Sequence, residues 1–247
     1  MTGHQLKLVP PPEQDAHDLV IVTHGFLSNG RSMDPIADQL SDAGYETLVW
    51  EYPSLRGSVL SHASRLVRVI RESMVRPEIR QIHFVAHSMG GIIARAAIST
   101  SHIETFAAER CGRLLMMAPP NKGSWLTRMP LGPFRGWFPQ LAEMGEHERS
   151  FVNQLPRPHV YEVGVLAAAQ DWIVSEPATH LDGQSAHTTL ATSHQRLVQH
   201  PTAIELTLRF LAEGHFDAES SVTEPARQLT QPEHQEVPRE EATRRAA

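Results

Sequence analysis

Residues 84–97 read FVAHSMGGIIARAA: an apolar run stops at Ser88, two glycines follow, and an apolar, alanine-rich segment continues. The first half predicts a buried strand and the second half a helix. The sharp turn that lifts a nucleophile above the edge of a sheet crowds the positions two before and two after it. Here those positions hold Ala86 and Gly90, which are both small. The stretch therefore predicts a catalytic serine, against the plainer interpretation of an N-cap on a buried helix.

Strand and helix patterns alternate along the rest of the chain, which is typical of a parallel sheet covered by helices. Short strands rich in apolar residues are predicted at 18–24, 47–52, 81–87, 113–118 and 159–167. Helices are predicted from the Asp34-Pro35 pair to Gly44, over 60–74, over 92–97 and after Pro201. We expect an α/β domain with a mostly parallel central sheet and helices on both faces.

Composition limits the classes of function. A chain of 247 residues that is 40% hydrophobic can bury one large core as a single domain. Its net charge of −6, without a block of Lys or Arg, argues against a nucleic-acid partner. Cys111 precedes an apolar run and fits a buried, reduced thiol. No signal peptide or membrane-spanning stretch is visible, so we expect a soluble, cytoplasmic protein unless a leader has been removed.

Two segments break the alternation. Residues 119–155 are rich in Pro, Gly, aromatic residues, Leu and Met without a clean period, and this excursion is expected near the functional site. Residues 214–247 are charged and almost free of large apolar side chains, which predicts a disordered tail. We therefore expect one domain over residues 1–213, with little room for a large cap domain.

Four places in the chain resemble the α/β-hydrolase superfamily, in particular small bacterial lipases and esterases with an A-x-S-x-G elbow. They are HGF at 24–26, AHSMGG at 86–91, an aspartate after a late strand and a histidine before the last helix. The resemblance covers about residues 15–212. It implies the α/β-hydrolase fold and a catalytic triad in the chain order serine, acid, histidine.

The acid of the implied triad is Asp171, which follows the predicted strand at 159–167. In this position a carboxylate orients the histidine and stabilises its charged form. The string DWIV at 171–174 also resembles the segment that follows the acid in the family. An aspartate in a turn is the plainer interpretation, and Asp182 is a weaker candidate because it follows no predicted strand.

Three histidines after Asp171 compete for the role of general base. His194 lies seven residues before Pro201, as the family's base commonly lies shortly before the last helix. His187 is the reserve candidate. His200 stands at the start of the helix, where capping or packing is the simpler role.

Acyl transfer needs two backbone N–H groups to hold the oxyanion. The amide of Met89, next to the serine, supplies one, and the resemblance implies Phe26 for the other. His24 and His87 are then interpreted as structural residues. The chemistry needs no cofactor, and no metal role is predicted because the chain has neither H-E-x-x-H nor C-x-x-C.

The substrate is predicted to be a small-molecule ester or a lipid. Large side chains of the excursion could form an acyl-binding wall or equally be core: Trp125, Leu126, Met129, Leu131, Phe134, Trp137 and Phe138. The string PPNKGS at 119–124 resembles lipase-like relatives and favours a hydrophobic ester. Alternatives are a thioesterase or amidase with the same triad, a non-catalytic binding module of this fold, and a phospholipase in peripheral contact with lipid.

Overall fold

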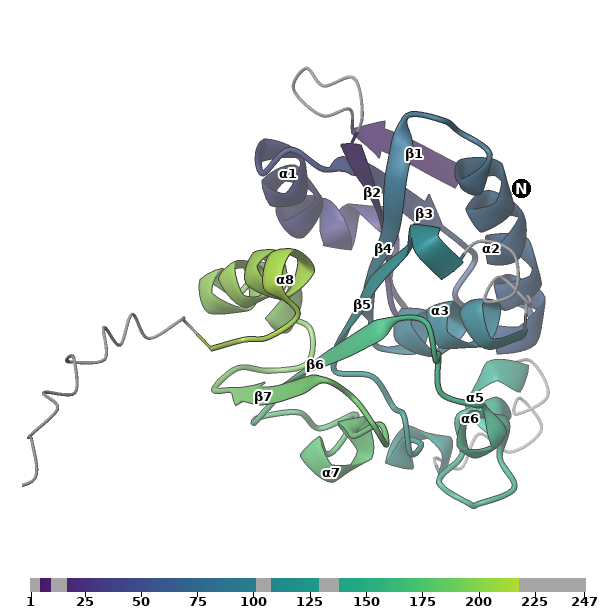
Figure 1. Ribbon diagram of the computed structural model, residues 1–247. Helices are drawn as coiled ribbons and strands as arrows, with labels where there is room; N and C mark the ends of the chain where they lie inside the picture. Colours follow the sequence, from purple (N-terminus) through teal and green to yellow (C-terminus); the bar gives the residue numbers. More distant parts are fainter. Residues whose placement is uncertain (1–4, 10–16, 101–107, 129–137, 218–247) are drawn as a thin grey trace, which may run out of the picture. The chain divides into compact units, whose positions relative to one another are not determined.

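The computed structural model describes residues 5–9, 17–100, 108–128 and 138–217. Seven strands in this part form one sheet in the order β1-β3-β2-β4-β5-β6-β7 (Figure 1). They are β1 (Gln5–Val9), β2 (His17–Thr23), β3 (Glu46–Glu51), β4 (Ile79–His87), β5 (Cys111–Met117), β6 (Glu162–Ala168) and β7 (Ala186–Leu190). The strand β1 pairs antiparallel with β3, and the other neighbouring strands are parallel.

The described helices connect these strands. The α-helices are α1 (Asp34–Asp42), α2 (Val59–Met74), α3 (Met89–Thr100), α5 (Pro139–Glu143), α6 (Phe151–Gln154), α7 (Glu176–Thr179) and α8 (Pro201–Glu213). Short 3₁₀ turns are η1 (Gly30–Met33), η2 (Ala108–Arg110), η3 (Trp125–Arg128) and η5 (Leu197–Gln199).

Local signals explain where the long helices begin and end. Ser58 caps α2 by accepting a hydrogen bond from Ser61 N, and the Ser61 side chain bonds back to the Ser58 amide. This reciprocal pair satisfies two amide donors that the first turn of a helix leaves unpaired. A proline starts α8, and Gly214 ends it in the left-handed conformation that glycine adopts most readily.

The sheet is buried on both faces. Along β2, Leu19 and Ile21 point into a core that includes residues of α2 and α3, whereas Val20 and Val22 point into a second core shared with α1 and α8. Figure 1 shows α1 and α8 on one side of the sheet and α2 and α3 on the other. This two-sided burial explains why the strand patterns are continuous apolar runs with little alternation.

The five predicted strands and four predicted helices are confirmed, with boundaries shifted by a few residues. The predicted fold class, a mostly parallel sheet with helices on both faces, is also confirmed. The sequence analysis missed β1 and β7, whose edge positions leave them partly exposed. Among the described residues, the β5–β6 excursion contains only short helical segments, and residues 129–137 of it lie outside the description.

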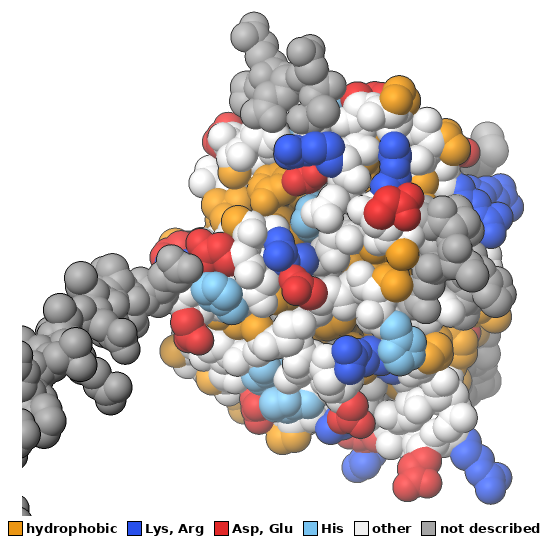
Figure 2. Space-filling model, viewed as in Figure 1, with side chains coloured by type: hydrophobic (Ala, Val, Ile, Leu, Met, Phe, Trp, Pro, Cys, Tyr) orange, Lys and Arg blue, Asp and Glu red, His pale blue; other side chains and the backbone are white. Residues whose placement is uncertain are grey.

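Compact packing continues through Phe216, slightly beyond the expected domain end at 213, because its ring packs beside Phe210. Most of the predicted tail, residues 218–247, lies outside the described residues. Cys111 is buried, as expected. On the face shown in Figure 2, basic and acidic side chains are interspersed rather than gathered by sign. No helix in the described ranges is long and apolar enough to cross a membrane.

Candidate active site

Ser88 occupies the predicted turn between β4 and α3. Its backbone is left-handed, with φ of 54°, and its amide donates to Met117 O at 2.8 Å. A Cβ at Gly90 would lie 2.4 Å from the backbone oxygen of His24, so only glycine fits there. At Gly91 a Cβ would lie 2.9 Å from the side chain of Met116, which shows how closely α3 approaches the sheet.

Backbone strain gathers at one edge of the sheet. The described non-glycine residues with positive φ are Leu27 at 55°, Ser88 at 54° and Ala118 at 47°. They follow β2, β4 and β5, which are neighbours in the sheet and parallel to one another. Strained conformations cluster at functional sites, and α/β sheets bind ligands beyond the carboxyl ends of their strands. Both generalisations indicate that the functional site lies at this edge of the sheet.

Asp171 and His194 form a buried pair at the same edge. His194 Nδ1 donates to Asp171 Oδ2 at 2.6 Å, and the two side chains are 7% and 1% exposed. The other carboxylate oxygen accepts hydrogen bonds from Ile173 N at 2.7 Å and Val174 N at 2.9 Å. These amides fix the carboxylate, which in turn holds the proton of His194 on Nδ1. Nε2 is left with a lone pair that can accept a proton.

Ser88 and His194 line one pocket, of about 200 Å³. Both apolar and polar residues line the pocket. They are Phe26, Leu27, Ser28, Ser32, His87, Ser88, Ile173, His194, Gln195, Val198 and Gln199. The structure thus brings the predicted nucleophile and the predicted base to one cavity, with the predicted acid paired to the base.

Of the two residues predicted to supply oxyanion donors, Phe26 lines this pocket and Met89 follows the pocket residue Ser88. The Phe26 ring packs edge-on against Phe138 with centroids 6.2 Å apart. Met89 directly follows Ser88 and is the first residue of α3, so its amide has no acceptor within the helix.

His24 shapes the loop that carries Phe26. Its Nδ1 donates to Gly25 O at 2.9 Å, and its Nε2 accepts from Tyr52 N at 3.3 Å. The Tyr52 hydroxyl donates to the backbone oxygen of His24, and the two rings are stacked 4.4 Å apart. Burial lowers the pKa of His24, which favours the neutral imidazole that these bonds require. This is the structural role expected for His24.

The rival candidates lie elsewhere, and none of the three lines the pocket of Ser88. Asp182 lines a hollow of about 700 Å³ together with Arg95. His187 lies on β7 with Nε2 3.0 Å from the Thr179 hydroxyl, and burial, followed by the nearby His180, lowers its pKa. His200 is the residue before α8, the helix-entrance position expected for it.

None of the described residues of the predicted acyl-binding wall, which are Trp125, Leu126 and Phe138, lines the pocket of Ser88. The Trp125 indole donates to Trp172 O, and Leu126 packs against the core. Met129 and Trp137 lie outside the described residues, as do Leu131 and Phe134.

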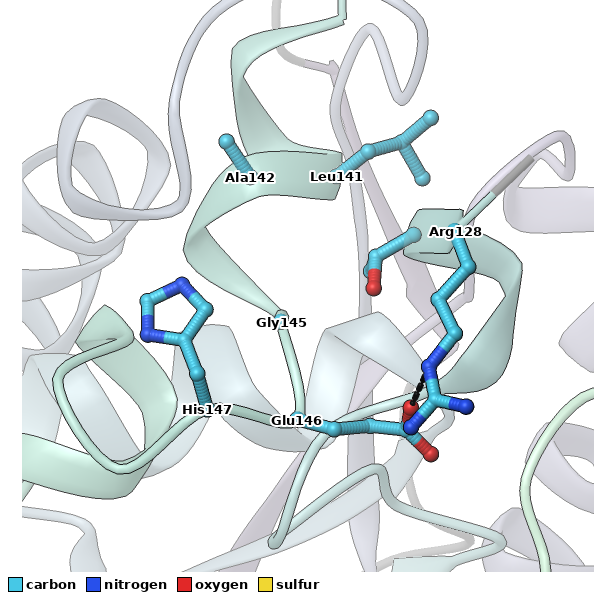
Figure 3. Close-up of a pocket in the computed structure, with 7 residues that line it drawn as sticks. Arg128, Leu141, Ala142, Gly145, Glu146 and His147 are labelled. Atoms are coloured by element: carbon cyan, nitrogen blue, oxygen red, sulfur yellow. Dashed lines mark ion pairs between the residues drawn. The ribbon is translucent and has the colours of Figure 1, made fainter. Parts of the chain in front are cut away.

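A separate hollow of about 420 Å³ lies within the excursion. Arg128 and Glu146 form an ion pair at its edge, 2.6 Å apart, and His147 lies across from them (Figure 3). Its described lining includes none of Ser88, Asp171 and His194.

Sequence reasoning missed several lining residues of the Ser88 pocket. Ile173 follows the predicted acid by two positions, and Val198 follows the predicted base by four. Nearness to the predicted acid and base was the one signal that could have found them, since nothing in their residue types marks them as pocket residues.

Part of the chain matches a known family. Residues 13–125, which include Phe26, Ser88 and Met89, match the model of the family described as "Putative serine esterase (DUF676)". No curated protein sequence matches the chain.

Several solved structures share the fold. The mature form of Bacillus licheniformis lipase BlEst2 has a TM-score of 0.66 at 16% identity, covering 84% of this chain and 98% of that one. For the propeptide form the TM-score is 0.68 at 16% identity and 84% coverage, and this chain spans 53% of its length. Est1E from Butyrivibrio proteoclasticus, with ferulic acid bound, has a TM-score of 0.59 at 16% identity, covering 85% of this chain and 93% of that one. The type II thioesterase BorB from the borrelidin biosynthetic cluster has a TM-score of 0.59 at 19% identity, covering 83% of this chain and 94% of that one.

These likenesses establish the fold, and the family match adds a likeness in the sequence around the elbow. Together with the mostly parallel sheet, they show that the chain has the α/β-hydrolase fold.

Proposed function

We propose that this protein is a serine hydrolase that cleaves carboxylic esters through an acyl-serine intermediate. The observation that carries the proposal is the 2.6 Å hydrogen bond from His194 to Asp171, made by a histidine that shares its pocket with Ser88. The match to a family of serine esterases supports the same chemistry.

The proposed reaction uses each group once in acylation and again in deacylation. His194 Nε2 takes the proton of the Ser88 hydroxyl while the serine oxygen bonds to the ester carbonyl carbon. The amides of Met89 and Phe26 hold the resulting oxyanion. The carbon–oxygen ester bond then breaks, and the alcohol leaves with the proton from His194. Water, deprotonated by His194, attacks the acyl-serine and releases the acid.

The pocket favours a small acyl group. Its volume of about 200 Å³ lies below the roughly 300–1,000 Å³ of common ligand pockets. Phe26, Leu27, Ile173 and Val198 supply apolar surface in it. We therefore propose esters of short, hydrophobic acids as the preferred substrates.

Intact-mass analysis after treatment with a serine-reactive fluorophosphonate tests the activated serine. We expect one adduct on the wild type and none on Ser88→Ala. The absence of an adduct on folded wild type would overturn the proposal and favour a non-catalytic binding module. Matched oxygen esters, thioesters and amides of one acyl group then identify the bond that is cleaved. A strong preference for the thioester would replace the ester proposal with a thioesterase.

A second candidate is action at a lipid surface, and exposed apolar residues at the site support it. Leu27 is 71% exposed and lines the pocket, while Trp172, next to pocket residue Ile173, is 82% exposed. Both side chains could enter the interface of a bilayer. Flotation with zwitterionic vesicles tests this idea, because a chain of charge −6 gains no attraction from anionic lipid. We expect binding that Trp172→Ala weakens; wild type that stays with the unbound fraction would eliminate the candidate.

A further inference from the structure

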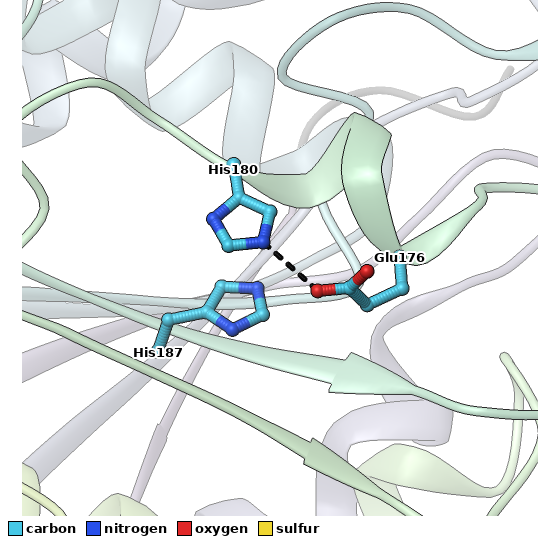
Figure 4. Close-up of side chains that lie close together, drawn as sticks. All are labelled: Glu176, His180 and His187. Atoms are coloured by element: carbon cyan, nitrogen blue, oxygen red, sulfur yellow. Dashed lines mark hydrogen bonds and ion pairs between the residues drawn. The ribbon is translucent and has the colours of Figure 1, made fainter.

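A group of metal-ligating side chains lies outside the active-site pocket. Glu176 belongs to α7, His180 follows this helix, and His187 lies on β7. One potential ligand atom from each residue lies within 4.8 Å of those of the other two. Figure 4 shows the two imidazoles facing each other, with the carboxylate beside them. None of the three residues lines the pocket of Ser88.

Close contacts already bring these groups together. His180 Nε2 lies 2.9 Å from Glu176 Oε1, and the rings of His180 and His187 are stacked with centroids 3.9 Å apart at 9°. On the far side of its ring, His180 Nδ1 lies 3.1 Å from Gln184 Nε2. The Gln184 amide donates in this bond, because its Oε1 accepts from Leu181 N at 2.9 Å, so the proton of the neutral His180 ring lies on Nε2, facing Glu176. A metal bound at Nε2 therefore requires this proton to move to Nδ1 and the Gln184 amide to turn away, since a ligating histidine donates from its second ring nitrogen.

We propose that Glu176, His180 and His187 bind one divalent transition-metal ion, with zinc as the best fit. Two imidazoles and one carboxylate form a donor set that zinc accepts in tetrahedral sites, with water in the fourth position. Calcium and magnesium prefer oxygen ligands and fit this set poorly.

Binding requires a modest rearrangement. Zinc bonds of about 2.0–2.1 Å at tetrahedral angles place ligand atoms roughly 3.3 Å apart. The three ligand atoms here lie within 4.8 Å of one another, so those that are farthest apart must move closer. The stacked rings must also turn, because a metal lies in the plane of each imidazole that holds it. All three side chains are partly exposed, which leaves them room to turn and gives water access.

The position of the site indicates a structural role. Two backbone acceptors already anchor the α7 segment: Ala178 O accepts from Lys122 N at 2.9 Å, and Thr179 O accepts from Asn121 Nδ2 at 2.8 Å. A metal would add a link from this segment to β7. It would brace the connection between β6 and β7, which carries Asp171 near its start. We expect bound zinc to stabilise the fold while leaving the chemistry at Ser88 largely unchanged.

Calorimetric and thermal titrations with zinc test the proposal on chelator-treated, dialysed full-length protein. We expect one ion per chain and a rise in Tm of roughly 5–10 °C at a hundredfold excess over Kd. His187→Gln and His180→Gln, each compared with its own metal-free Tm, should lose this rise. Cobalt, used as a spectroscopic probe, should give visible absorption typical of a tetrahedral site in the wild type and not in either variant.

Because the chain has 15 histidines, weak binding elsewhere must be separated from this site. His147 is exposed and far along the chain from the cluster, so His147→Gln serves as the matched control. The control should keep the full zinc response. A response that survives both His180→Gln and His187→Gln, that disappears in the control, or that is absent from wild type would overturn the proposal.

Discussion

The His87 side chain donates a hydrogen bond from Nε2 to the backbone oxygen of His194 at 3.0 Å. The two rings lie 4.7 Å apart at an angle of 53°. Burial, followed by the nearby His194, lowers the pKa of His87 to about 3, so its ring remains a neutral donor at ordinary pH. The residue before the proposed nucleophile therefore holds the backbone of the proposed base.

His87→Leu removes this bond and is expected to lower kcat roughly 5- to 10-fold, since one hydrogen bond contributes about 1 kcal/mol. His87→Gln retains a donor and should restore part of the loss. His62→Leu is a matched control, because His62 is a buried histidine that bonds the backbone oxygen of Arg56 at 2.7 Å. Steady-state kinetics and thermal unfolding would distinguish the roles. If His87→Leu lost stability like the control but kept its kcat, His87 would have no positioning role.

Acid should destabilise the protein through its buried histidines. Burial lowers the pKa of His87, His24 and His62 below their value of 6.5 in the unfolded chain. Below pH 6.5 the unfolded chain takes up protons that these folded side chains do not, so the stability they contribute falls as pH falls. For His87 the loss continues towards pH 3, at up to roughly 1.4 kcal/mol per pH unit. Urea unfolding between pH 7 and pH 4 measures the slope.

His87→Gln should flatten this dependence, because the variant lacks one of the three groups. An equal slope in wild type and variant would show that His87 contributes nothing to it.

Asp171→Asn tests the orientation of the base. The amide oxygen can still accept from Ile173 N and Val174 N, but the amide nitrogen would face His194 Nδ1 and favour the wrong tautomer. We expect kcat to fall by a factor on the order of 10³–10⁴ with little change in fold. Asp182→Asn, at the rival acid, should keep nearly full activity. The reverse ranking in ester hydrolysis would assign the acid to Asp182.

The predictability of each part depended on how local its signal was. The elbow was predictable because Ala86, Ser88 and Gly90 act within one turn, and β2 because burial on both faces makes its residues apolar in sequence. The strands at the two ends of the sheet, β1 and β7, lack that signal. They are partly exposed to water, and their sequences mix polar with apolar residues. The pocket and the metal-ligand group were not predictable, since His187 joins Glu176 only after β7 pairs with β6.

Substitutions at the two small positions of the elbow, Ala86 and Gly90, should differ sharply in their cost in stability. Gly90→Ala places a Cβ against the backbone of the HGF loop, where neither side can move easily, and is expected to cost about 1–3 kcal/mol or more. Ala86→Gly converts the elbow to G-x-S-x-G and should cost only about 0.5–1 kcal/mol, from the added backbone freedom. Chemical unfolding of both variants checks this order, and equal costs would contradict it.

The acyl-length profile should depend on Ile173 and Val198 rather than on the excursion. Ile173→Ala and Val198→Ala each enlarge the pocket, and both should move the preferred acyl chain to greater length in a panel of p-nitrophenyl esters. Trp125→Ala is the control, because this side chain is 45% exposed and does not line the pocket. It should leave the profile unchanged. A shift in Trp125→Ala alone would instead place the acyl chain along the excursion, which is one of the two roles that the sequence left open for these side chains.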